Sequence, residues 1–222
     1  MSLKTAIEYH RALGSWAVQR LKGKELSTDL RIFLSAGCFD VALEHQNAIV
    51  VLCEKQLFGS AFALIRVIFE ACVRGVWLHQ CATEQEITKY KNDTLDRKFF
   101  LILQDVEKLD GFEEGILGEV KSNYWKSMNS FTHTGILQVS RRLSEDSIGP
   151  RYSDGEILEM LSFSGAMCLF AAQQIALLSG DISLANEMLG KIDDFANAEF
   201  YSTGAAASDA AHRPQHVGKV RE

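Results

Sequence analysis

Three charged residues, Arg66, Glu70 and Arg74, stand four positions apart in the apolar stretch FALIRVIFEACVRGVWLH, residues 62–79. Side chains four positions apart meet on one face of an α-helix, so Glu70 can pair with both arginines. On a helical wheel these residues and Trp77 fall within roughly 80° of one another. The spacing predicts one charged stripe, composed of Arg66, Glu70 and Arg74, on an otherwise apolar helix.

The charged stripe carries two positive charges and one negative charge, so one positive charge is in excess. Charges inside a protein are tolerated only when they are paired and hydrogen-bonded, so this excess requires a carboxylate from another helix or an anionic ligand. A carboxylate would make the stripe a packing network that fixes helix register. A phosphate or carboxylate ligand would make it a binding site, and both interpretations remain open.

A second candidate group lies in YWKSMNSFTHTGILQVSRR, residues 124–142. His133 and Arg141 are eight positions apart and would share a helix face, and either Thr132 or Thr134 would suit an N-cap. This arrangement would place His133 at or near a helix start, where a neutral imidazole is favoured and can act as a base or acceptor. Alternatively, His133 only braces a turn.

Together the two groups predict an internal polar site. Its candidate ligand-binding residues are Arg66, Glu70, Arg74, Trp77, His133 and Arg141, with His133 also the candidate catalytic residue. The surrounding segment is locally basic, which favours an anionic ligand without choosing between RNA, nucleotide and metabolite. The sequence has no Gly-rich phosphate loop, HExxH, GxSxG or metal-ligand spacing, so we predict no metal and no cofactor and leave catalysis open.

Composition limits the class of protein. The 222 residues carry a formal net charge of -6, which argues against broad attraction to nucleic acid or to anionic membranes. The N-terminal segment lacks an apolar core long enough for a signal peptide, and the five cysteines are scattered without a CxxC pair. The apolar stretches 62–79 and 161–178 are interrupted by polar side chains, so we expect no membrane span. These features predict a cytoplasmic protein with reduced cysteines.

Helical patterns extend along most of the chain, which has only two prolines and no convincing alternation of polar and apolar residues. Helices are predicted over residues 3–21, 27–54, 58–81, 84–109, 113–129, 132–144, 153–179 and 181–198. We therefore predict an all-α multi-helix bundle, one domain over residues 1–200, with a central apolar helix near 58–81. Residues 201–222 are small and polar and predict a flexible, loosely held C-terminal tail.

Local signals mark several of the predicted helix ends. Ser27 or Thr28 is expected to cap the second helix, and residues 59–60 are expected to separate the second helix from the third in a tight hairpin. Ser153 stands three positions before Glu156, which is the spacing of a capping box at a helix start.

The chain resembles a bacterial family of all-helical proteins of unknown function in three stretches: HQNAIVVLCEKQLFGSAFALIRVIFEACVRGVWLHQCAT, WKSMNSFTHTGILQVSRR and YSDGEILEML. The resemblance covers residues 35–180 and implies a cytoplasmic helical bundle without an established activity. More distantly, the chain is similar to HEPN-type bundles, some of which are dimeric metal-independent ribonucleases with an arginine and a histidine a few positions apart. RGVWLH, from Arg74 to His79, has that pattern, although five positions along a straight helix set the side chains about 140° apart.

Three functions are consistent with these observations. The first is a ligand-binding or protein-interaction module whose internal Arg/Glu/His site takes a small anionic ligand or a nucleotide. The second is a HEPN-like ribonuclease or a nucleotide-binding toxin or defence protein, in which an arginine and His79 or His133 act on a phosphodiester. The third is a purely structural polar network with function at a surface or dimer interface. The apolar helix set predicts a homodimer.

Overall fold

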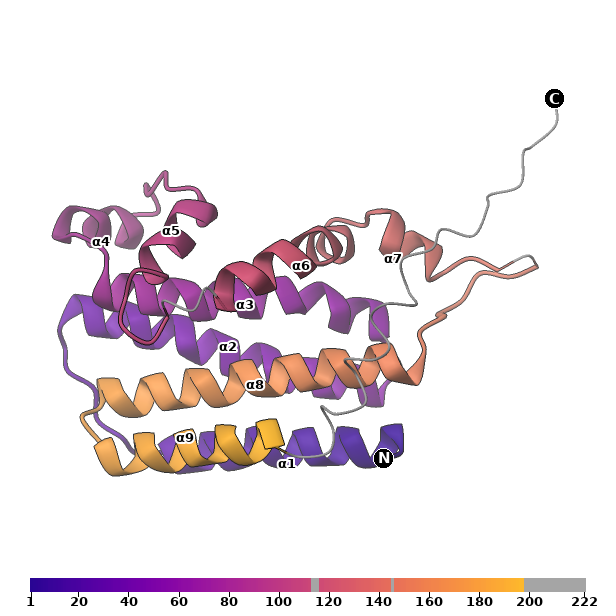
Figure 1. Cartoon of the computed structure of the whole chain (residues 1–222), viewed down its shortest axis with the longest axis horizontal. Helices are drawn as coiled ribbons and strands as arrows, with labels where there is room; N and C mark the ends of the chain where they lie inside the picture. The colour runs from indigo at the N-terminus through magenta and orange to yellow at the C-terminus, as the bar shows by residue number, and fades with distance from the viewer. Residues whose placement is uncertain (113–115, 145, 198–222) are drawn as a thin grey trace.

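The computed structural model describes residues 1–112, 116–144 and 146–197. Within these ranges the chain forms nine helices and no strand apart from an isolated bridge between Leu143 and Ile148. The helices are α1 (Leu3–Leu21), α2 (Leu30–Glu54), α3 (Phe58–Gln80), α4 (Glu84–Lys91), α5 (Phe99–Val106), α6 (Ile116–Thr132), α7 (Ile136–Ser140), α8 (Asp154–Leu178) and α9 (Ile182–Asn197). The predicted all-α multi-helix bundle is confirmed (Figure 1). The predicted tail, residues 201–222, lies outside the described residues, and the single-domain assignment stays a prediction.

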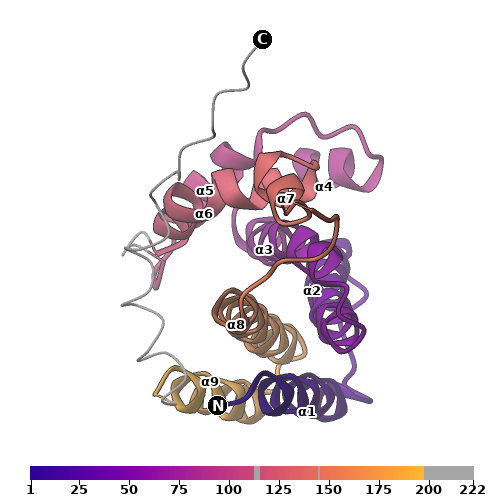
Figure 2. The ribbon, with the colours of Figure 1, turned by 90° about the vertical axis from the view of Figure 1, so that its right-hand side faces the viewer.

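The helices are arranged in layers, as the end-on view in Figure 2 shows. α1 and α9 lie side by side on one outer side, α2 and α8 lie next to them, and α3 separates these helices from α5 and α6. α3 packs against α2, α5, α6 and α8 and buries most of its apolar side chains. The central position predicted for this helix is confirmed.

Close packing between α2 and α3 depends on Gly75. A Cβ atom placed on Gly75 would lie 2.6 Å from the Phe39 ring, which is 1% exposed. Such a distance is shorter than any ordinary contact, so the absence of a side chain allows the two helices to approach. Phe39, Phe69 and Trp77 are the largest side chains of the core cluster on this side of the bundle.

The helix ends agree with the sequence at one predicted cap and differ at two others. The Ser153–Glu156 capping box is present at the start of α8. α2, however, is capped by Asp29, whose carboxylate accepts from two backbone N–H groups, instead of by Ser27 or Thr28. The break before α3 also differs from the prediction, because it lies at Gln56 and not at residues 59–60, which are inside the first turn of α3.

Gln56 ends α2 in a Schellman motif. Its φ is 56°, its N–H bonds the carbonyl of Cys53 at 3.0 Å, and the N–H of Leu57 bonds the carbonyl of Leu52 at 2.8 Å. These two bonds satisfy carbonyls at the end of α2 without a glycine. Glycine alone was therefore a poor marker of the hairpin turn.

Two of the predicted helices, over 84–109 and 132–144, are wrong in extent. The helix expected over 84–109 is divided into α4 and α5, because Asp93 adopts a φ of 53° after α4. The helix expected over 132–144 is reduced to α7, since Thr134 also adopts a positive φ, 54°. Residues with β-carbons adopt this left-handed backbone conformation only at single positions in turns. Neither helix can therefore continue through Asp93 or Thr134.

α8 is the helix, within the described ranges, that is long and apolar enough to cross a membrane. In the bundle, 61% of the most apolar 18-residue stretch of α8 is buried. This burial is that of a core helix, because a lipid-facing helix would leave its apolar side chains on the outside.

Candidate functional site

The charged stripe forms on α3 as its spacing predicts. Arg66 Nε donates to Glu70 Oε1 at 2.8 Å, and Arg74 Nη2 donates to Glu70 Oε2 at 3.1 Å. The three side chains are 17–29% exposed, so they lie at the rim of the bundle interior. Glu70 therefore bridges both arginines and uses one oxygen for each.

Two aromatic rings from other helices cover the guanidinium groups. Arg66 Cζ lies 4.7 Å from the centre of the Trp125 ring on α6, and Arg74 Cζ lies 5.7 Å from the Phe99 ring on α5. The two rings stack on each other with centroids 5.2 Å apart and an interplanar angle of 3°. A cation above an aromatic face is attracted by the ring quadrupole, so this pair holds both guanidinium groups in place.

His133 reaches the same stripe from the end of α6. Its Nε2 lies 2.6 Å from Arg66 Nη1. A guanidinium has donors only, so the imidazole accepts this hydrogen bond through an unprotonated Nε2. His133 is exposed, and Arg66 therefore connects the partly buried stripe to a solvent-facing imidazole.

The predicted position of His133 at a helix start is wrong. His133 directly follows the last residue of α6, and its N–H bonds the carbonyl of Asn129 at 2.9 Å. Thr132 does not act as an N-cap, because its hydroxyl donates to the carbonyl of Ala63 on α3 at 3.2 Å. His133 therefore lies at a helix C-terminus, where the carbonyl ends favour nearby positive charge such as that of Arg66.

The turn after His133 is held by Ser130. The N–H of Gly135 bonds the Ser130 carbonyl at 2.6 Å, and the Ser130 hydroxyl accepts from the N–H of Leu137 at 2.9 Å. These bonds, together with the Thr132 contact to α3, fix the backbone on both sides of His133. The backbone that carries the imidazole is thus positioned by the fold.

Two predicted site residues lie elsewhere. Trp77 is 1% exposed and donates from Nε1 to Asp105 at 3.2 Å, while Arg97 stacks on its ring and pairs with Asp105. Arg141 pairs with Glu156 at the start of α8. Arg141 leaves the His133 face because the continuous helix expected over 132–144 does not form.

A third cation adjoins the site. Lys121 Nζ lies 5.9 Å from the centre of the Trp125 ring and 5.1 Å from that of Phe100. In the part of the chain that the structure describes, the only carboxylate within ion-pair distance of the stripe arginines is Glu70. The cluster of Arg66, Arg74, Lys121 and Glu70 therefore has three positive charges and one negative charge, which suits an anion and not a metal ion.

The guanidinium groups also retain donors for a ligand. Arg66 Nη2 and Arg74 Nε and Nη1 make no hydrogen bond to any of the described residues. Arginine donates in a planar fork that matches carboxylate and phosphate oxygens. These donors and His133 are the groups through which an anion could be held.

The Arg74–His79 pattern is not brought together in this way. His79 lies next to Arg31, whose guanidinium donates to the carbonyls of Leu78 and His79. Burial, with a smaller contribution from the Arg31 charge, lowers the pKa of His79. Arg74 instead pairs with Glu70, so the two members of the pattern have different neighbours.

Comparison with known protein families gives a match over residues 39–199, to a family of unknown function, DUF6988. The chain belongs to this family. No curated protein and no solved structure matches it. The predicted membership in an all-helical family of unknown function is thereby confirmed, whereas the bacterial origin and the HEPN resemblance stay predictions.

Proposed function

We propose that this DUF6988 protein is a cytoplasmic ligand-binding module that holds an anionic group, a phosphate or a carboxylate, at the charged stripe and His133. One observation carries the proposal: the two stripe arginines share the single carboxylate of Glu70, and Lys121 adds a third cation. Partly buried positive charge without a counter-charge is unfavourable, and an anion would remove that cost.

The site is organised for such a ligand before it binds. Glu70 fixes the two guanidinium groups from one side, and Trp125 and Phe99 fix them from another. Binding then orders few additional side chains, and the entropy lost on association is correspondingly small. The exposed position of His133 gives the anion access from solvent.

A packing network is the second candidate function for the stripe. The contacts of Arg66 with Trp125 and of Arg74 with Phe99 favour it, because desolvated cation–π pairs compensate part of the excess charge. In that case the stripe joins α3 to α5 and α6, and functional contacts lie on another surface or at a dimer interface. The HEPN-like ribonuclease and the homodimer remain predictions beside these two.

A thermal-shift screen distinguishes the two candidates. The probes are inorganic phosphate, pyrophosphate, nucleoside monophosphates and citrate at constant ionic strength, because an anion bound only to the native state raises the free energy of unfolding. At about 100 times its Kd, a ligand adds about 2.7 kcal/mol, which for a chain of this size raises the Tm by several degrees. Arg74→Gln should remove most of the rise, while Lys91→Gln, an exposed cation on α4, should preserve it. A flat screen, or a rise that survives Arg74→Gln, supports the packing network.

A further inference from the structure

A row of four side chains along α6 lies beside the charged stripe. Its members follow one another at intervals of four positions: Lys121, Trp125, Asn129 and His133. Residues at this spacing form a continuous ridge on a helix. His133 still belongs to the ridge, because its N–H bonds the carbonyl of Asn129 as in a helix. This α6 row is in contact with α3, since Trp125 and His133 both meet Arg66.

The α6 row is longer than a single anion. Twelve positions separate Lys121 from His133, which corresponds to roughly 18 Å along the axis of a helix. Positive charge is distributed over this length, with Arg66 next to His133 and Lys121 next to Trp125. A lone phosphate or carboxylate would contact only part of the row. The length therefore suits a ligand that carries a second group beside its anion.

An exposed aromatic ring lies at the Lys121 end of the row. Phe100 on α5 is 45% exposed, and the Lys121 ammonium lies 5.1 Å from the centre of its ring. The neighbouring Phe99 is already engaged, because it stacks on Trp125 and lies close to Arg74. Phe100, in contrast, meets no other aromatic ring among the residues that the structure describes. An exposed ring beside a cation suits a flat aromatic group on the ligand.

Lys121 can serve either this ring or an anion. Its Nζ lies over the Phe100 and Trp125 rings and forms no ion pair with a carboxylate of the described residues. An exposed cation–π contact is weaker than a charge-assisted hydrogen bond to phosphate. The flexible lysine stem would let the ammonium turn toward a phosphate at the charged stripe. That movement would uncover the Phe100 ring for an aromatic group of the ligand.

We propose that the ligand is a nucleoside phosphate, with its phosphate at Arg66, Arg74 and His133 and its base stacked on Phe100. The assignment rests on the proposed function, because it requires an anion at the charged stripe. Stacking accepts every base, since every base has an aromatic face, so the class of ligand is assigned and the base is left open. The net charge of -6 disfavours a polynucleotide, so the ligand is a mononucleotide.

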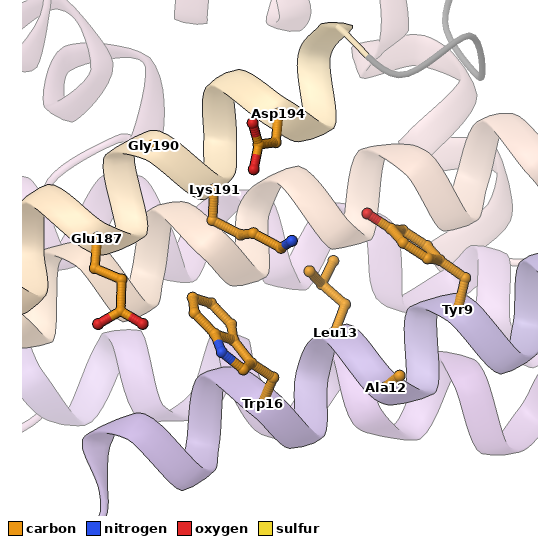
Figure 3. Close-up of a pocket in the computed structure, with 8 residues that line it drawn as sticks. All are labelled: Tyr9, Ala12, Leu13, Trp16, Glu187, Gly190, Lys191 and Asp194. Atoms are coloured by element: carbon orange, nitrogen blue, oxygen red, sulfur yellow. The ribbon is translucent and has the colours of Figure 1, made fainter.

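A groove of about 650 Å³ between α1 and α9 is the competing place for such a ligand (Figure 3). It lies on the other side of the bundle from α5 and α6, and Trp16 offers a ring there. Glu187, Asp194 and Lys191 line it as well, and Glu187 pairs with Arg20. These described charges balance, so the groove has no excess positive charge to hold a phosphate.

Calorimetric titration of the full chain with inorganic phosphate, ribose 5-phosphate and AMP at constant ionic strength tests the assignment. AMP should bind about tenfold more tightly than ribose 5-phosphate, because stacking of the base adds to phosphate binding. Phe100→Leu should remove this difference and leave the Kd of ribose 5-phosphate unchanged. Phe33→Leu, at an exposed ring on α2, and Lys191→Gln, in the groove, are controls that should preserve the difference. Arg74→Gln should weaken AMP and ribose 5-phosphate equally.

Saturation-transfer NMR of AMP with the wild-type protein is a second measurement that needs no variant. The adenine protons should receive more saturation than the ribose protons, because the base would lie against Phe100. Equal Kd values for AMP and ribose 5-phosphate would overturn the nucleoside assignment, while binding of phosphate would still support the anion site. An AMP preference that persists in Phe100→Leu would overturn stacking on Phe100. If none of the three compounds binds, the proposed function fails together with this assignment.

Discussion

At the scale of single residues, the energetics of the charged stripe depend on Glu70. Its two oxygens accept from Arg66 and Arg74, which would otherwise be like charges held together at the rim of the core. The three side chains are partly buried, at 17–29% exposed, so solvent screens their interaction only in part. Glu70 is thus the residue whose removal changes the stripe most.

Glu70→Gln should lower the free energy of unfolding by about 1–2 kcal/mol, below the cost of breaking a fully buried ion pair because solvent reaches the site. Urea unfolding measures the change, and Glu44→Gln, an exposed carboxylate on α2, should stay within about 0.5 kcal/mol of the wild type. If an anion binds at the stripe, phosphate should stabilise Glu70→Gln more than it stabilises the wild type. An unchanged stability in Glu70→Gln would show that the guanidinium groups do not require this carboxylate.

The burial of the cysteines predicts how fast each thiol reacts. All five cysteines are free, and four are buried, whereas Cys81 is partly exposed. Burial raises the pKa of Cys53 and of Cys168 to about 12, and a thiol reacts as its thiolate. Ellman's reagent should therefore titrate one thiol per native chain rapidly, and none in Cys81→Ala. Two or more rapidly reacting thiols per native chain would contradict the burial of the other four cysteines.

At the scale of helices, the packing of α2 on α3 requires a glycine at position 75. Gly75→Ala should lower the free energy of unfolding by about 1–3 kcal/mol, because its Cβ would overlap the Phe39 ring. Gly37→Ala is the matched control on α2, since its Cβ would meet no atom within 4 Å. This control should be stabilising by about 0.5–1 kcal/mol, the helical preference of alanine over glycine. Chemical unfolding of both variants checks the pair, and equal effects would argue against close packing at Gly75.

The charged stripe and the position of His133 differ in how far the sequence predicts them. The stripe was predictable, because its contacts are between residues four positions apart on one helix. The place of His133 was not, since it depends on the left-handed backbone of Thr134 and on a bond from Thr132 to α3. The rings of Trp125 and Phe99 were also missed, because they come from other helices and their spacing in the sequence carries no signal.

For the whole molecule, the fold class could be predicted because helical periodicity recurs along the chain and only two prolines interrupt it. The layer order could not, because it is set by contacts between helices distant in the sequence. His10 illustrates this point: it is 1% exposed, its ring meets that of Phe195 on α9 edge-on, and Gly165 on α8 lies against it. His10 thus lies where α1, α8 and α9 meet.

The burial of His10 makes the stability of the whole bundle depend on pH. Burial lowers the pKa of His10 to about 4, compared with about 6.5 in an unfolded chain. Between these values the unfolded chain binds a proton that the folded chain does not, so the free energy of unfolding decreases as the pH falls through this window. The loss should be about 3 kcal/mol by pH 4. Urea unfolding between pH 7 and pH 4 measures it, and His10→Gln should flatten the slope while His45→Gln should not. Equal slopes in wild type and His10→Gln would contradict this origin.

Below this window two carboxylates extend the acid sensitivity. Burial raises the pKa of Glu156, but hydrogen bonds from Ser153 and Arg141 outweigh it, so the pKa is lowered overall. Burial also raises the pKa of Asp105, but hydrogen bonds from Trp77 and Arg97 outweigh this effect. The pKa of Asp105 is therefore lowered overall. A carboxyl group whose pKa is lowered by folding stabilises the fold at pH values above its pKa in the unfolded chain. This stabilisation is lost as the pH falls through its pKa in the folded chain. Both contributions should therefore disappear below about pH 4.

Imidazole NMR of the native protein shows whether an anion binds beside His133. The chain has six histidines, and phosphate is titrated at constant ionic strength while their ring signals are followed. Because His133 Nε2 lies 2.6 Å from Arg66, an anion at the stripe should shift the His133 signals saturably. The signals of His10, His45 and His79 should stay in place, and Arg74→Gln should weaken the effect. Unchanged His133 signals, or equal shifts in all histidines, would contradict the proposed site.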